Sequence, residues 1–183
     1  MKQEIIIAGF GGQGVLSMGK ILAYCGIMQD MEVTWMPSYG PEMRGGTANV
    51  CVILSDRKIG SPIVTKYDTA IILNQQSMDK FEAAVKPGGL LVYDPSGITR
   101  HPERTDITIA KIDAIDVAAQ VGNSKVYNMA VLGAFLKLRP IISMENVDKG
   151  LAKCIPARYS DLISLNRAAI DLGMEKVETV KVQ

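Results

Sequence analysis

Cysteine and histidine are scarce in this chain, and their placement argues against a metal site. The 183 residues include three cysteines, Cys25, Cys51 and Cys154, and a single histidine, His101. Iron–sulfur clusters and structural zinc sites use closely spaced thiolates, and no two of these cysteines are close in sequence. We therefore expect no cofactor or metal to be bound by this chain alone. The cysteines are expected to be reduced thiols packed as small apolar side chains, and His101 to lie in a surface loop.

Net charge, aromatic residues and long apolar runs are also limited. Twenty basic and 19 acidic residues give a formal net charge of +1. The electrostatic field of such a chain is too weak to favour binding to nucleic acid or to an anionic membrane. At 5% of the residues, aromatics offer no stacking platform for single strands. No run approaches the ~20 apolar residues of a membrane span, and no signal-peptide pattern precedes the first apolar segment. The sequence predicts a cytoplasmic protein that binds neither nucleic acid nor membrane.

The chain does contain an alternation of apolar strand patterns and helical patterns. Continuous runs rich in Ile, Val and Leu are typical of strands covered on both faces. They occupy residues 4–8, 32–36, 47–54, 69–74, 90–94 and 106–111. Helical patterns occupy residues 14–29, 76–85 and 113–121, and three more follow at residues 127–138, 143–154 and 159–172. Residues 86–89, Lys-Pro-Gly-Gly, predict a helix stop and a turn before the next strand.

These patterns predict an α/β fold. The segments that join the strand at residues 47–54 to the neighbouring strands are too short for a parallel crossover. Some strand pairing is therefore expected to be antiparallel. No linker, repeat or low-complexity segment divides the sequence. We therefore expect residues 1–183 to form a single domain. Its predicted architecture is a three-layer α/β/α Rossmann-like domain with a mixed sheet and a helical C-terminal end.

A glycine-rich turn follows the first predicted strand. Gly9, Gly11 and Gly14 match the spacing of a dinucleotide-binding fingerprint, and the turn opens a helical pattern whose N–H groups favour an anion. The fingerprint also needs an acidic residue at the end of the second strand, whereas Glu32 lies at its start, which disfavours an NAD-dependent dehydrogenase. A turn that only lets helix and strand pack remains equally compatible with the motif.

The second notable segment, residues 39–46, reads Tyr-Gly-Pro-Glu-Met-Arg-Gly-Gly. Glycine and proline break regular structure on both sides and leave Glu42 and Arg44 on a short constrained loop. Arg44 could bind a phosphate or a carboxylate through two parallel hydrogen bonds. The alternative is a Glu42–Arg44 surface ion pair, which would contribute only ~0–1 kcal/mol and would not need so many turn residues. We favour a ligand site or a subunit interface.

Together these segments resemble the gamma subunit of 2-oxoacid:ferredoxin oxidoreductases. The likeness covers nearly the whole chain and is carried by residues 9–15, 38–46, 55–62, 128–133 and 166–169. The form of residues 39–46 is more similar to the 2-oxoglutarate and branched-chain members than to the pyruvate members. The resemblance implies a subunit of a complex that converts a 2-oxoacid, here 2-oxoglutarate, into acyl-coenzyme A and CO2 while reducing ferredoxin.

The resemblance also implies where the cofactors lie. This chain has no Gly-Asp-Gly sequence for a diphosphate-bound magnesium and no cysteine spacing for a cluster. Thiamine diphosphate, Mg2+ and the iron–sulfur clusters are therefore expected on partner subunits: alpha, beta and, as a further candidate, delta. No catalytic residue is expected here. Residues expected to contact coenzyme A or a partner chain are Gly9, Gly11, Gly12, Gln13, Gly14, Tyr39, Gly40, Pro41, Glu42, Arg44, Gly45 and Gly46. The alternative is a stand-alone nucleotide-binding or regulatory module without redox partners.

Overall fold

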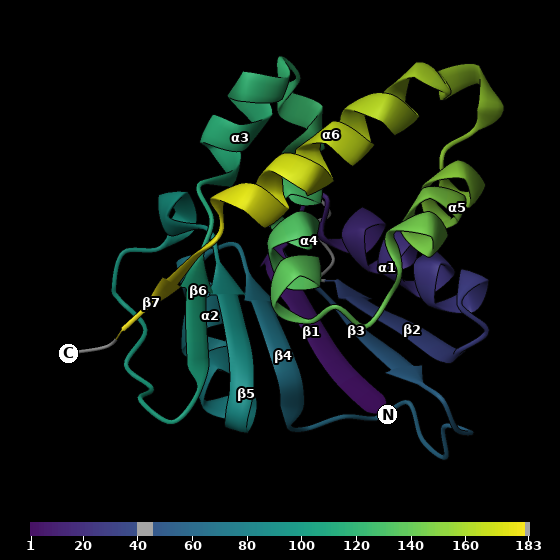
Figure 1. Cartoon of the computed structure of the whole chain (residues 1–183). Helices are drawn as coiled ribbons and strands as arrows, with labels where there is room; N and C mark the ends of the chain where they lie inside the picture. Colours follow the sequence, from purple (N-terminus) through teal and green to yellow (C-terminus); the bar gives the residue numbers. More distant parts are fainter. Residues whose placement is uncertain (40–45, 182–183) are drawn as a thin grey trace.

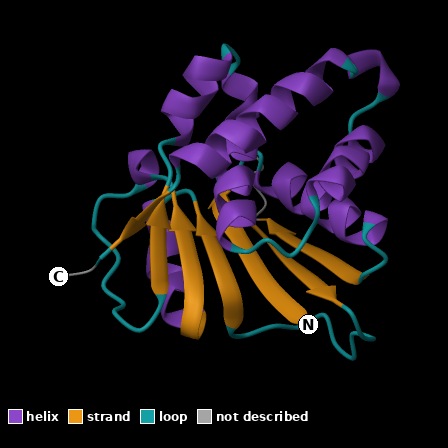
Figure 2. Cartoon of the chain, in the orientation of Figure 1, coloured by secondary structure: helices purple, strands orange, loops and turns teal. Residues whose placement is uncertain are grey.

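The computed structural model shows a seven-stranded sheet with helices on both faces (Figures 1 and 2). It describes residues 1–39 and 46–181. The order of elements agrees with the prediction through α6, and the three-layer α/β/α architecture is confirmed. The strands and helices are β1 (Lys2–Phe10), α1 (Val15–Met28), β2 (Glu32–Tyr39), β3 (Thr47–Ser55), β4 (Tyr67–Ile72), α2 (Gln75–Phe81), β5 (Val85–Tyr93), β6 (Thr108–Lys111), α3 (Ala114–Val121), α4 (Tyr127–Leu138), α5 (Met144–Cys154), α6 (Asp161–Lys176) and β7 (Glu178–Val180).

The sheet is mixed, as predicted, with the strand order β2-β3-β1-β4-β5-β6-β7. Strands β1, β4, β5 and β6 are parallel, β3 is antiparallel to both β1 and β2, and β7 is antiparallel to β6. Tyr39 pairs with Ala48, and Phe10 pairs with Thr47. The ends of β1 and β2 and the start of β3 therefore meet at one edge of the sheet, where the parallel strands also have their carboxyl ends.

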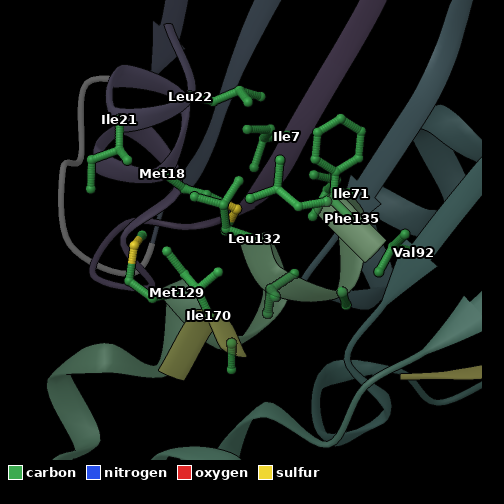
Figure 3. Close-up of a cluster of buried hydrophobic side chains, with 14 of the residues drawn as sticks. Ile7, Met18, Ile21, Leu22, Ile71, Val92, Met129, Leu132, Phe135 and Ile170 are labelled. Atoms are coloured by element: carbon green, nitrogen blue, oxygen red, sulfur yellow. The ribbon is translucent and has the colours of Figure 1, made fainter. Parts of the chain in front are cut away.

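The two faces of the sheet bury separate cores, because side chains alternate along each strand. Ile7 belongs to the larger core, which packs against α1, α3, α4, α5 and α6, whereas Ile6 belongs to the smaller core beneath α2. Helix α4 is the centre of the larger layer, with every residue from 128 to 136 buried. Figure 3 shows its Leu132 and Phe135 among the side chains of this core.

Helix α4 and helix α6 approach each other closely through two glycines. A Cβ atom added to Gly133 would lie 2.1 Å from the carbonyl oxygen of Ile170, and one added to Gly173 would lie 2.1 Å from that of Ala130. Real Cβ atoms essentially never come that close, so each glycine lets the backbone of one helix rest on the other. This contact fixes α6 over α4, as the crossing helices in Figure 1 show.

The turn predicted at residues 86–89 is wrong. Strand β5 already begins at Val85, which pairs with Tyr67, while Leu90 pairs with Thr69, so the residues between them form an irregularity inside the strand. Gly88 has φ 73°, and the N–H of Gly88 donates to the Asp106 carbonyl oxygen at 2.8 Å. Proline and glycine here mark a bulge and not the end of an element. The short edge strand β7 was not predicted.

The cysteines lie on three different elements, of which α1 and α5 pack together, and His101 lies in a loop. Cys25 on α1 and Cys51 on β3 are buried, Cys154 on α5 is partly buried, and His101 is exposed. Burial raises the pKa of Cys25 to about 12 and the pKa of both Cys51 and Cys154 to about 11. These thiols therefore stay protonated at neutral pH. Across residues 1–39 and 46–181, no helix is long and apolar enough to cross a membrane.

Candidate functional site

The glycine turn connects β1 to α1 and is held by one side chain. Gln13 Oε1 accepts a hydrogen bond from the Phe10 N–H at 2.6 Å, and Gln13 Nε2 donates to the Leu73 carbonyl oxygen at 3.1 Å. Gly12 and Gly14 adopt φ angles of 101° and 73°, a region that favours glycine. A Cβ on Gly9 would lie 2.6 Å from Gln13 Oε1, so this glycine makes room for the amide.

Gln13 spans the point where the chain changes sides of the sheet. Helix α1 leaves β1 toward the larger core, whereas α2 leaves β4 toward the smaller core. Doubly wound α/β folds bind ligands outside the carboxyl ends of the strands at such a crevice. Here the Gln13 side chain ties the turn after β1 to the end of β4. The cavity described below lies beside this turn and the start of α1.

The two motifs that the sequence singled out meet at this edge. The Gly11 N–H donates to the Gly46 carbonyl oxygen at 2.8 Å, and Tyr39 ends β2 beside the start of β3. Five of the predicted site residues, namely Gly40, Pro41, Glu42, Arg44 and Gly45, lie outside the described residues, and their roles stay predictions.

A cavity of about 860 Å³ opens on the helical side of the glycine turn. Gly12, Gln13 and Gly14 form one wall, and residues of α1, α3, α4 and α6 form the others. Asn128 Nδ2 donates to the Gly14 carbonyl oxygen at 3.1 Å, which joins α4 to the turn. Its amide fits closely against Gly14, where an added Cβ would lie 2.5 Å from Nδ2. The volume is within the range of small-molecule sites, roughly 300–1,000 Å³.

The cavity reveals two site residues that the motifs did not assign, Asn128 and Asn166. Both line the cavity, from α4 and α6, although they are 114 and 152 positions away from Gly14. The segments that contain them, residues 128–133 and 166–169, contributed to the family resemblance, and this was the available sequence signal. Their shared position could not be seen from periodicity, because both stand in ordinary helical patterns.

Tyr127 and Ser96 line the cavity and lie near the buried Asp94. Asp94 is fully buried and accepts a hydrogen bond from the Ser96 N–H at 2.8 Å, which starts a short turn after β5. Burial and then the neighbouring Asp94 carboxylate raise the pKa of Tyr127. The Tyr127 hydroxyl therefore remains protonated and can only act as a hydrogen-bonding group at neutral pH.

Comparison with known proteins identifies the group to which this chain belongs. A model of the family described as pyruvate ferredoxin/flavodoxin oxidoreductase matches residues 4–176. The chain belongs to this oxidoreductase family. Within the family, it is 36% identical to the 2-oxoglutarate synthase subunit KorC of Methanocaldococcus jannaschii over 85% of each chain.

Other members of the oxidoreductase family differ in length. The ketoisovalerate oxidoreductase subunit VorA of Methanothermobacter thermautotrophicus is 34% identical over 94% of this chain, yet this chain spans only 36% of VorA. The crystal structure of the keto/oxoacid ferredoxin oxidoreductase gamma subunit from Geobacter sulfurreducens is also similar to this chain. The two structures superpose over 96% of each chain, with a TM-score of 0.83 and 31% sequence identity. The same fold unit therefore occurs both as a separate chain and as about a third of a longer one.

Proposed function

We propose that this chain is the gamma subunit of a 2-oxoacid:ferredoxin oxidoreductase that uses 2-oxoglutarate. The observation that carries the proposal is the match to proteins of its own length, KorC over 85% and the Geobacter gamma subunit over 96% of each chain. The complex would convert the 2-oxoacid and coenzyme A into acyl-coenzyme A and CO2 and would pass two electrons to ferredoxin. We infer 2-oxoglutarate as the substrate from the similarity to KorC. The similarity to VorA makes a branched-chain oxoacid the second candidate.

The chemistry of this chain supports cofactors on partner subunits. Burial raises the pKa of each of its three thiols to about 11 or 12, whereas an iron–sulfur cluster is held by cysteine thiolates, commonly four of them. No group of three or more His, Cys, Asp or Glu side chains within the described ranges could hold a metal ion. The residues present therefore do not fit a cluster or a diphosphate-bound Mg2+. We expect alpha and beta subunits, and a delta subunit as a further candidate, to supply thiamine diphosphate, Mg2+ and the clusters.

Within the complex, we assign the edge formed by the glycine turn and residues 39–46 to contact with coenzyme A or with a partner chain. Support comes from the hydrogen bond between Gly11 and Gly46, which places the two motifs side by side. The start of α1 at this edge favours negative charge, and Arg44 is expected to bind a phosphate of coenzyme A.

The experiment that tests the subunit role is ferredoxin or viologen reduction with the partner subunits, with and without this chain. Purified chain alone is expected to be colourless and inactive, and activity should appear only in the mixture. Full activity of the partner subunits without this chain would contradict the proposal, as would an iron–sulfur absorbance band in this chain alone.

Replacing Gly12 with valine tests whether the glycine turn has a role beyond folding. Gly12 has φ 101° with no atom within 4 Å of an added Cβ, so the variant is strained by about 1–3 kcal/mol while a side chain projects into open space. Gly88→Val is a matched control, because Gly88 also has positive φ and open space but lies near the opposite edge of the sheet. We expect similar losses of stability in both variants. Only Gly12→Val should lower the activity or the assembly of the complex per folded chain. If the two variants are equally active, the glycine turn has a purely structural role.

A further inference from the structure

The edge of the sheet where β2 lies beside α1 exposes large apolar side chains (Figure 1). Trp35 and Met36, in the middle of β2, are each 40% exposed, and Ile27, near the end of α1, is 47% exposed. Trp35 is also the only tryptophan of the chain. Tryptophan and methionine are enriched in the buried centres of protein interfaces, so apolar side chains gathered at one edge indicate a contact.

Two glycines of α1 bring the helix directly against this edge strand. A Cβ atom added to Gly19 would lie 3.3 Å from Trp35 Nε1, and one added to Gly26 would lie 3.0 Å from Val33 Cγ2. The two glycines are seven residues apart, which places them on the same side of the helix two turns from each other. The helix therefore runs along β2, and Ile27 follows Gly26 at the level of Val33.

The exposed apolar side chains reach both faces of the sheet edge. Met36 pairs with Cys51, which belongs to the smaller core, whereas Val33 packs against the larger core. Successive side chains of a strand point to opposite faces, so Trp35 and Met36 flank the edge from its two sides. We call the residues of this region the edge surface: Ile27, Val33, Trp35 and Met36.

Strand pairing is a poor way to cover the edge surface. Pro37 lies within β2, and edge strands hold a proline where its missing N–H faces outward. A strand added here would lack that hydrogen bond, which disfavours a second copy of this chain joined through β2. The occupant is instead expected to use side-chain contacts.

We propose that the edge surface docks a partner subunit of the complex, which presents apolar side chains to both sides of β2. This chain spans only 36% of VorA, so most of that polypeptide lies outside the shared unit and is available to cover this edge. For a separate gamma chain, the counterpart of that polypeptide is a partner subunit. The inference rests on the proposed function and adds the surface through which the subunits join.

Charges at the two ends of the edge surface give the partner an orientation. Asp30 and Glu32 are exposed in the turn between Ile27 and β2, and Lys20 is exposed next to Gly19. The matching surface is therefore apolar in the middle, with a basic group toward Glu32 and an acidic group toward Lys20.

The single tryptophan allows a direct test with the unsubstituted sequence. This chain, labelled with fluorotryptophan, gives one fluorine NMR signal, whose shift between H2O and D2O reports the exposure of Trp35. On assembly with unlabelled partner subunits, that solvent shift is expected to disappear. A Trp35 that stays exposed in an assembled, active complex would overturn the docking surface and leave the subunit role intact. Failure to assemble would overturn both. In the chain alone, a dimer that buries Trp35 would also overturn the proposal.

Three glutamate variants locate the contact. Trp35→Glu should weaken association with the partner subunits about thirtyfold or more, and Ile27→Glu, on the neighbouring helix, about tenfold. Ile63→Glu is the control, because Ile63 is 74% exposed in the loop that leads from β3 away from β2 to β4, and it should leave association unchanged. Circular dichroism checks that each variant folds. Equal association of folded Trp35→Glu and Ile63→Glu would overturn the proposal, and if Trp35→Glu does not fold, the fluorine signal decides.

Discussion

Replacing Gly133 with alanine is expected to lower the free energy of unfolding by about 3 kcal/mol, because the added methyl group would meet the backbone of α6. A Cβ at Gly133 would lie 2.1 Å from the Ile170 carbonyl oxygen, and a backbone atom cannot move aside as a flexible side chain can. Helix propensity alone predicts the opposite, since alanine stabilises a helix interior by up to about 1 kcal/mol relative to glycine. The sign of the change therefore separates the two effects. Urea denaturation followed by circular dichroism measures it.

Two further substitutions complete this test. Gly173→Ala should destabilise the protein to a similar extent, because its Cβ would meet the Ala130 carbonyl oxygen at 2.1 Å. Gly60→Ala is the control, since no atom lies within 4 Å of a Cβ added there, and its effect should stay within about 0.5 kcal/mol. If Gly133→Ala is as stable as the parent or more stable, the two helices are not held by backbone contact at these glycines.

The second large effect is expected at Arg44. In the assembled complex, Arg44→Ala should raise the apparent Michaelis constant for coenzyme A tenfold to hundredfold, since a charge-assisted contact contributes ~1.5–3 kcal/mol. The constant for the 2-oxoacid should change little, because the 2-oxoacid is expected to contact the partner subunits. Arg44→Lys keeps the charge but loses the paired hydrogen bonds, and should restore function only in part.

Arg57→Ala is the control for this experiment, because the Arg57 side chain is 89% exposed. It removes the same charge from the chain and should leave the kinetics unchanged. An unchanged Michaelis constant for coenzyme A in the fraction that still assembles, together with weakened assembly, would place Arg44 in a subunit interface. Unchanged kinetics with intact assembly would exclude both roles.

Most of the fold could be predicted from local patterns, and the errors have physical causes. Apolar runs such as that of β1 revealed the central strands because these strands are buried on both faces. Strand β2 extends past Pro37 to Tyr39, beyond the predicted end, because an edge strand tolerates a residue without an N–H. Residues 86–89 form a bulge although their composition predicts a turn, since glycine and proline serve both. Strand β7 depends on pairing with β6, which no short pattern records.

The candidate site could be predicted only in part. The glycine spacing indicated a turn at the end of β1, and the structure adds the hydrogen bond that joins this turn to Gly46. The role of Gln13, which binds both Phe10 and Leu73, depends on a residue 60 positions away. The cavity was beyond sequence reasoning for the same reason, because Asn128 and Asn166 approach the turn only after α4 and α6 pack together. Long-range packing decides which helical side chains face a site.

Affinity purification of this chain from its native cell tests the central claim most directly. If the chain is a gamma subunit, it should be recovered with a thiamine diphosphate-dependent pair of chains and an iron–sulfur protein, and the recovered assembly should reduce ferredoxin or viologen when given 2-oxoglutarate and coenzyme A. Recovery of the chain without such partners, and without that activity, would contradict the account.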